Sequence, residues 1–178
     1  MVAFLVIQRL LRRTESAKSF HRGAFDKGSM LLIGSAFGVG LWLPLVLDIL
    51  GVALRPIDLF EGLVALAVMV FGLGLRIWAA VTLGKYYTRT LMITEDHKVV
   101  STGPYARVRH PAYLGVLLLW AGFGVLSSNL ITVFLFPIVF VVVYLYRISV
   151  EERMLVKELG DDYIQYQRKT RKLIPYLY

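Results

Sequence analysis

Long apolar stretches alternate with polar ones along the chain. Four of the apolar stretches carry few charges, and they cover residues 30–50, 59–83, 112–126 and 130–148. A helix needs about 20 mostly apolar residues to cross the ~30 Å hydrocarbon core of a bilayer, so the pattern predicts about four transmembrane helices, of which the third is short. We therefore expect an all-α integral membrane protein.

Only a Ser-Ser-Asn tripeptide separates the third stretch from the fourth. A polar connection of this length is typical of a tight turn between antiparallel helices, so residues 112–148 are predicted to form a helical hairpin. Apolar positions at helical spacing continue beyond residue 148 and are interrupted at Gly160. They predict that the fourth helix extends into the polar tail, where a shorter amphipathic helix and an extended end at Pro175 follow.

The chain divides into three predicted parts. Residues 1–28 hold a short apolar run followed by arginines, and we interpret them as an amphipathic helix in the membrane interface. A truncated fifth span is the alternative, and a cleaved signal peptide is not expected. Residues 29–83 supply two transmembrane helices. Residues 84–178 form the third part, with a polar loop at 84–111, the hairpin at 112–148 and C-terminal helices at 149–178.

Lysines and arginines are unevenly distributed around these spans. Six lie in residues 1–28, five in the 84–111 loop and seven from Arg147 onward, whereas the two opposite connections hold only Arg55. Cytoplasmic loops of membrane proteins are rich in Lys and Arg, so we expect both termini and the central loop on the cytoplasmic side. The net charge of +8 is then explained by topology and anionic headgroups, and a nucleic-acid partner is not expected.

The composition narrows the chemistry that the chain can perform. Apolar residues make up 57% of it and the mean hydropathy is +0.65, as expected for a protein in lipid. The absence of cysteine excludes thiolate nucleophiles and thiolate metal sites. The three histidines, His21, His97 and His110, are too far apart to form a local metal-binding motif, so no metal is expected.

The loop before the third span ends in the sequence Arg109-His110-Pro111. Proline fits the first turn of a helix, so the span should begin at Pro111 with His110 at its N-terminus. There the backbone amides favour a negative or electron-rich ligand group, and Tyr113 lies one helical turn further on. The alternative is that Arg107, Arg109 and His110 form only a basic collar at the membrane surface.

The end of the fourth span carries Arg147, Glu151 and Glu152. Arg147 and Glu151 are four residues apart and share one helix face, whereas Glu152 is rotated by ~100°. Glu151 can pair with Arg147 or with the ammonium group of a ligand, and the alternative is an ordinary surface ion pair. Arg76, about two turns before the end of the second span, is a further candidate whose long side chain can also extend to the membrane surface.

Four sequence blocks together resemble the isoprenylcysteine carboxyl methyltransferase family and the wider group of membrane methyltransferases that includes phospholipid N-methyltransferases. They are residues 97–105 (HKVVSTGPY), 109–115 (RHPAYLG), 147–153 (RISVEER) and 160–163 (GDDY), the last followed by RKLIP at 171–175. The resemblance covers roughly residues 66–177, and its strength lies in the order and spacing of the blocks.

The resemblance implies a methyltransferase that uses S-adenosylmethionine, held in a cytoplasmic pocket between the central loop, the start of the hairpin and the helix that leaves its second arm. It implies that Arg147 lies near the substrate and that Glu151 meets the charged amino-acid end of the cofactor. The other cofactor contacts that it implies are His97, Lys98, Val99, Val100, Tyr105, His110, Pro111, Ala112 and Tyr113.

The leading hypothesis is carboxyl methylation of a lipophilic, prenylcysteine-like substrate that enters sideways from the bilayer. A carboxylate is already deprotonated at neutral pH, whereas methylation of a phospholipid amine or a small thiol would require a base or a neutral nucleophile. A sterol-type reductase would require a phosphate-binding cluster for a nicotinamide cofactor. A non-enzymatic membrane scaffold or transporter subunit would show polar groups along a transmembrane path.

Overall fold

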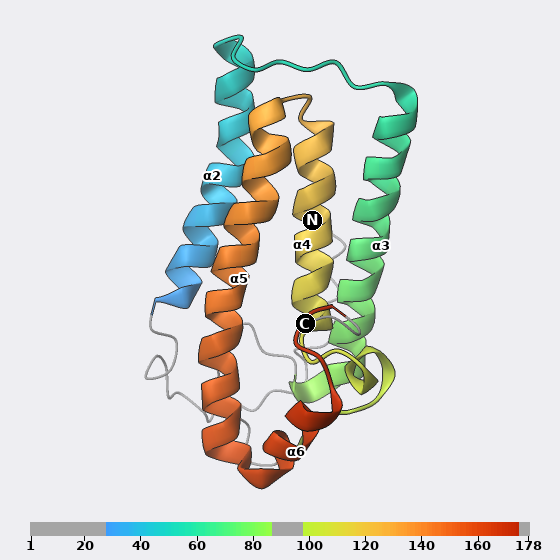
Figure 1. Cartoon of the computed structure of the whole chain (residues 1–178), viewed down its shortest axis with the longest axis vertical. Helices are drawn as coiled ribbons and strands as arrows, with labels where there is room; N and C mark the ends of the chain where they lie inside the picture. Colours follow the sequence, from blue (N-terminus) through green and yellow to red (C-terminus); the bar gives the residue numbers. More distant parts are fainter. Residues whose placement is uncertain (1–27, 87–97, 175–178) are drawn as a thin grey trace.

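The computed structural model describes residues 28–86 and 98–174, whose secondary structure is helical apart from two isolated β-bridges. The prediction of an all-α protein is confirmed. In chain order the helices are α2 (Ser29–Ile49), α3 (Leu59–Leu83), α4 (Pro111–Leu126), α5 (Leu130–Leu159) and α6 (Asp161–Lys169), and the short 3-10 helices η2 (Gly84–Tyr86) and η3 (Gly103–Ala106) lie in the central loop (Figure 1).

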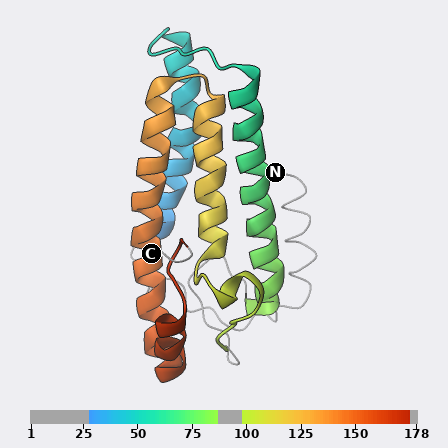
Figure 2. The same ribbon diagram turned by 45° about the vertical axis from the view of Figure 1, so that its right-hand side comes forward.

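Helices α2 to α5 run side by side along the long axis of the molecule (Figure 1, Figure 2). α4 packs between α3 and α5, and α2 packs against α5. α4 and α5 are joined by the short turn at residues 127–129 and form the predicted antiparallel hairpin. α5 extends beyond its neighbours, and α6 turns back toward the start of α4 (Figure 1).

The helices begin and end close to the predicted positions. Pro111 occupies the first helical position of α4 and His110 its N-cap, as expected. α5 ends before Gly160, whose φ of +54° lies in the left-handed region that favours glycine. The expected interfacial helix in residues 1–28, apart from Gly28, and the extended end at Pro175 lie outside the described residues, as does His97. The division of the chain into three parts stays a prediction.

Three of the described helices, α2, α3 and α5, are long and apolar enough to cross a bilayer, whereas the apolar α4 has 16 residues. The 30 residues of α5 extend about 45 Å at 1.5 Å per residue. Its last third, which carries the charges from Glu151 onward, therefore lies beyond the ~30 Å hydrocarbon core. Large apolar side chains are exposed along α2 and α3, as expected of surfaces that face lipid. The chain is an integral membrane protein.

Aromatic side chains fill the space between α2, α4 and α5. Trp120 of α4 stacks on Phe140 of α5 with ring centroids 4.2 Å apart, and Phe37 of α2 meets both rings edge-on. α3 and α4 instead approach through glycines, because Gly72 and Gly115 lie so close that a side-chain carbon on either would collide with the opposite backbone. This close packing fixes the first turn of α4 beside α3 and α5.

Candidate functional site

Polar side chains gather at the end of the bundle where α4 begins and α5 extends beyond it. Arg147 of α5 is central to this group, and only 3% of it is exposed. Its Nη1 donates to the hydroxyl oxygen of Ser29 at 2.6 Å, and its Nε donates to the hydroxyl oxygen of Tyr113 at 3.3 Å. The first residue of α2 and the first turn of α4 therefore both hold the guanidinium in place.

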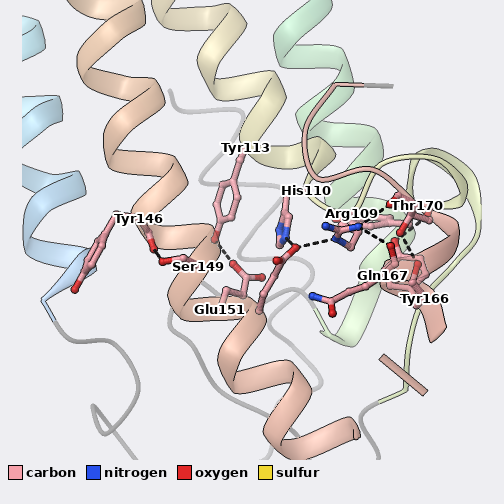
Figure 3. A network of polar contacts seen from close by, with 11 residues as sticks. Arg109, His110, Tyr113, Tyr146, Ser149, Glu151, Tyr166, Gln167 and Thr170 are labelled. Atoms are coloured by element: carbon pink, nitrogen blue, oxygen red, sulfur yellow. Dashed lines mark hydrogen bonds and ion pairs between the residues drawn. The ribbon is translucent and has the colours of Figure 1, made fainter. Parts of the chain in front are cut away.

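Tyr113 connects Arg147 with Glu151. The tyrosine hydroxyl donates to Oε2 of Glu151 at 2.6 Å, while its oxygen accepts from Arg147. Figure 3 shows the Tyr113 ring reaching from α4 toward Glu151 on α5. Among the described residues Tyr113 is the only hydrogen-bond partner of the Glu151 side chain, so the Oε1 atom of this half-buried carboxylate is available to a ligand.

Glu152 points toward the loop before α4 and contacts different partners. Its Oε1 accepts from Nε of Arg109 at 2.8 Å and lies 3.1 Å from Nε2 of His110. An ionised carboxylate can only accept, so His110 carries a proton on Nε2. Burial by itself raises the pKa of Glu152, but the hydrogen bonds from His110 and Arg109 outweigh burial and lower the pKa from 4.5 to about 2.

The low pKa of Glu152 predicts a stabilising effect that depends on pH. Because the pKa is lower in the folded chain than in the unfolded one, the contribution is fully present above pH 4.5 and is lost as the pH falls through about 2. The melting temperature in detergent should therefore exceed that of Glu152→Gln by a constant margin from pH 7 to pH 5, and the margin should shrink at lower pH. A margin between the two melting temperatures that persists at pH 2 would contradict the low pKa assigned to Glu152. Glu158→Gln, at an exposed position of the same helix, is the control.

The central loop packs against the same end of the bundle. Tyr105 is buried against Ala79 and Ala112, and Val100 packs beside them. The carbonyl oxygen of Tyr105 accepts from the hydroxyl of Tyr166 in α6 at 2.8 Å. Burial raises the pKa of this phenol, so Tyr166 remains a neutral donor.

Arg76, the charge inside α3, also reaches this end of the bundle. Its Nη1 lies 3.5 Å from the carbonyl oxygen of Ala112, at the limit of a hydrogen bond. Its side chain is half-buried and meets the first turn of α4, a placement that accounts for a charge in an apolar helix.

Most of the predicted site residues are brought together. Those that gather here are Val100, Tyr105, His110, Pro111, Ala112, Tyr113, Arg147 and Glu151. Lys98 is exposed and Val99 half-buried, and in residues 28–86 and 98–174 the Lys98 side chain has no hydrogen bond to this group. His97 lies outside the described residues, so its predicted role is untested.

Comparison with known proteins gives the family of the chain. The family model of the isoprenylcysteine carboxyl methyltransferase (ICMT) family matches residues 64–157, which is more than half of the sequence. The chain belongs to the ICMT family. The matched region runs from α3 into the last part of α5 and contains the linked side chains of Tyr113, Arg147 and Glu151.

Curated relatives of this ICMT family member carry the name protein-S-isoprenylcysteine O-methyltransferase. The one from Schizosaccharomyces pombe is 35% identical over 113 residues, which are 62% of this chain and 48% of the relative. Form B from Arabidopsis thaliana is 32% identical over 114 residues, 63% of this chain and 58% of the relative. The chain thus spans about half the length of these relatives.

A solved structure of the eukaryotic intramembrane Ras methyltransferase ICMT has the same fold. Its TM-score to this chain is 0.67, the two are 23% identical, and the match covers 97% of this chain and 61% of the other. At this level of identity the likeness concerns the arrangement of the helices.

Sequence patterns did not predict a role in the site for three residues of this ICMT family member, Ser29, Arg109 and Glu152. Arg109 is not part of a solvated collar, because its side chain is only 10% exposed and its Nη1 donates to the carbonyl oxygens of Gln167 and Thr170. One signal in the sequence could have indicated the role of Glu152. Adjacent residues of a helix face different directions, so Glu152 cannot share the partner of Glu151 and needs a cationic partner of its own.

Proposed function

We propose that this protein catalyses carboxyl methylation of a lipophilic, prenylcysteine-like substrate, with S-adenosylmethionine as the methyl donor. The observation that carries the proposal is the buried Arg147, which lies between the apolar spans and the polar end of the bundle and is linked through Tyr113 to Glu151. A guanidinium in such a place suits an acidic group on an apolar substrate, because its planar fork matches a carboxylate. Membership of the ICMT family supports the methyl transfer.

The residues beside Arg147 fit the methyl donor. Glu151 has a carboxylate oxygen without a hydrogen-bond partner among the described residues, and an ammonium group is a suitable donor to it. His110 and Tyr113, whose rings stack with centroids 5.7 Å apart, flank this position from the start of α4. We assign Val100 and Tyr105 to the loop side of the same pocket. When bound, S-adenosylmethionine supplies a methyl group that its sulfonium sulfur makes electrophilic.

Arg147 orients the methyl acceptor in this mechanism. A carboxylate is ionised at neutral pH and needs no general base, so the main requirement is alignment with the methyl group. Ser29 and Tyr113 already hold the guanidinium, which reduces the reorganisation needed when the substrate binds.

We assign the site to the cytoplasmic face of the membrane. The uneven distribution of lysine and arginine supports this orientation, since the loop before α4 and the chain after α5 hold most of the described cations. The apolar part of the substrate can then approach from the bilayer, while the water-soluble methyl donor arrives from the cytoplasm.

An amine or a thiol acceptor makes a different demand on the site from a carboxylate. Those acceptors lose a proton when they are methylated and so benefit from a nearby base. With its Nε2 proton facing Glu152, a neutral His110 can accept a proton only at Nδ1. A carboxylate acceptor has no such requirement.

Binding of two candidate ligands, one for each type of cofactor, tests the proposed function. The purified protein in detergent is titrated in a calorimeter with S-adenosylhomocysteine and, separately, with a reduced nicotinamide nucleotide, and we expect heat of binding only with the first. Absence of binding by S-adenosylhomocysteine would overturn the methyltransferase proposal. The acceptor is tested with labelled S-adenosylmethionine and a prenylcysteine, and its carboxamide is the control that should not be methylated.

Replacement of Glu151 by alanine is expected to weaken S-adenosylhomocysteine binding by roughly 10-fold or more, because a charge-assisted hydrogen bond is lost. Turnover at saturating S-adenosylmethionine should change less. Calorimetry and steady-state kinetics measure the two effects, with Glu158→Ala on the exposed side of α5 as the matched control. An unchanged dissociation constant together with slow turnover would place Glu151 on the substrate side instead.

A further inference from the structure

Arg109 joins segments that are distant in the sequence. Its Nε donates to Glu152 of α5, and its Nη1 donates to the carbonyl oxygens of Gln167 at 3.0 Å and Thr170 at 2.6 Å. Figure 3 shows the Arg109 side chain pointing toward Gln167 and Thr170. The arginine therefore links the loop before α4 both to α5 and to residues 161–174, which we call the C-terminal segment.

Backbone hydrogen bonds strengthen the same junction. The amide of Arg109 donates to the carbonyl oxygen of Arg171 at 2.8 Å, and the amide of His110 donates to that of Lys172 at 3.2 Å. In the opposite direction, the amide of Arg171 donates to the carbonyl oxygen of Arg107 at 2.9 Å. The C-terminal segment is thus paired with the loop immediately before α4, where the proposed cofactor pocket begins.

The charge balance of this junction depends on Glu152. The Arg109 and Glu152 side chains are only 10% and 13% exposed. Removing the anion of such a buried pair destabilises the fold, because the remaining cation is left without compensation. In the part of the chain that the structure describes, Glu152 is the only carboxylate that forms an ion pair with Arg109. The same Oε1 atom also contacts His110, so one carboxylate orients both side chains.

We propose that the ion pair between Arg109 and Glu152 is a positioning device for cofactor binding. By orienting the Arg109 guanidinium it helps hold the C-terminal segment against the loop before α4, and it fixes the imidazole of His110 in the pocket. Both members act through other groups, so they are positioning residues and not catalytic ones. The inference rests on the proposed function and adds to it that cofactor affinity depends on this ion pair, whereas methyl transfer after binding does not.

Hydrogen exchange of the ligand-free protein tests the structural part of the proposal. Glu152→Gln keeps the size of the side chain and one carbonyl oxygen but removes the charge. Amide exchange in residues 161–174 should become roughly 10-fold faster, the factor expected for loss of one charge-assisted hydrogen bond. Exchange in α2, α3 and α4 should stay as in the wild type, and Glu158→Gln on the same helix should change neither region.

Binding and kinetics test the functional part. In Glu152→Gln the dissociation constant of S-adenosylhomocysteine and the KM for S-adenosylmethionine should both rise by roughly 10-fold, while kcat stays within about threefold of the wild type. Glu152→Asp retains the charge and should recover part of the affinity. If Glu152→Gln does not accumulate as folded protein, Glu152→Asp replaces it, and the same changes in dissociation constant and KM are expected at a smaller size.

The outcomes separate this inference from the proposed function. If residues 161–174 of Glu152→Gln exchange at the same rate as in the wild type, the inference is overturned. Faster exchange throughout the bundle would also overturn it, because it would indicate a general effect on stability. Unchanged affinity in a variant whose C-terminal segment has loosened would overturn the link to cofactor binding. If the wild-type protein itself does not bind S-adenosylhomocysteine, the proposed function fails, whatever the exchange data show.

Discussion

Arg147→Ala is expected to lower methyl transfer at saturating S-adenosylmethionine by at least about 100-fold, the effect usually seen when a preorganised charged donor is removed from a reaction site. Its guanidinium is the buried cation that the proposed mechanism places on the acceptor carboxylate. Binding of S-adenosylhomocysteine should change by less than about threefold, because Glu151 and not Arg147 is assigned to the cofactor. Calorimetry and initial rates measure the two effects on the same preparation.

Two further variants control the arginine experiment. Arg147→Lys keeps a positive charge but loses the planar fork, so it should retain cofactor binding and remain strongly impaired in turnover. Arg153→Ala removes an exposed arginine from the same helix and should have little effect. If Arg147→Ala loses cofactor binding as severely as it loses turnover, the roles assigned to Arg147 and Glu151 are wrong.

Gly115→Ala is expected to destabilise the fold by about 1–3 kcal/mol, the usual cost of overpacking a well-packed interface. A side-chain carbon at this position would lie 2.5 Å from the carbonyl oxygen of Gly72 and 3.0 Å from backbone and side-chain atoms of Arg76. Because both helices are rigid there, α3 and α4 must separate to make room. The melting temperature in detergent measures the loss.

Gly74→Ala is the matched control for the glycine experiment. Gly74 lies in α3, the helix that Gly115 of α4 approaches, but a side-chain carbon there would have no atom within 4 Å apart from the adjoining backbone of its own helix. Alanine is the better helix former, so this variant should be as stable as the wild type or slightly more stable. Equal stability of Gly115→Ala and Gly74→Ala would show that the close approach of α3 and α4 does not limit stability.

The helices of this protein were largely predictable because each depends on local sequence. An apolar run must match the thickness of the bilayer, so the second span was predicted with the bounds 59–83 that α3 has. Pro111 and Gly160 mark a helix start and a helix end through their own backbone preferences. Features of this kind do not require knowledge of what the helix packs against.

The partners of the charged side chains were much less predictable. Glu151 and Glu152 are adjacent and chemically identical, yet one accepts from Tyr113 and the other from Arg109, 43 positions away. Ser29, one of the hydrogen-bond partners of Arg147, is 118 positions away and belongs to a span without any motif. Helical spacing shows that the two carboxylates diverge, but it does not show what each one meets.

The sequence alone determined that this is a helical membrane protein with a hairpin at 112–148, and its motifs indicated the family that the comparisons then confirmed. The packing of α4 between α3 and α5 decided which groups form the candidate site, and the return of α6 decided that Arg109 is a buried junction and not a surface collar. The physical reason is that hydrophobic length and backbone preference act within one segment. The partner of a buried charge is instead set by contacts among segments that only the folded chain brings together.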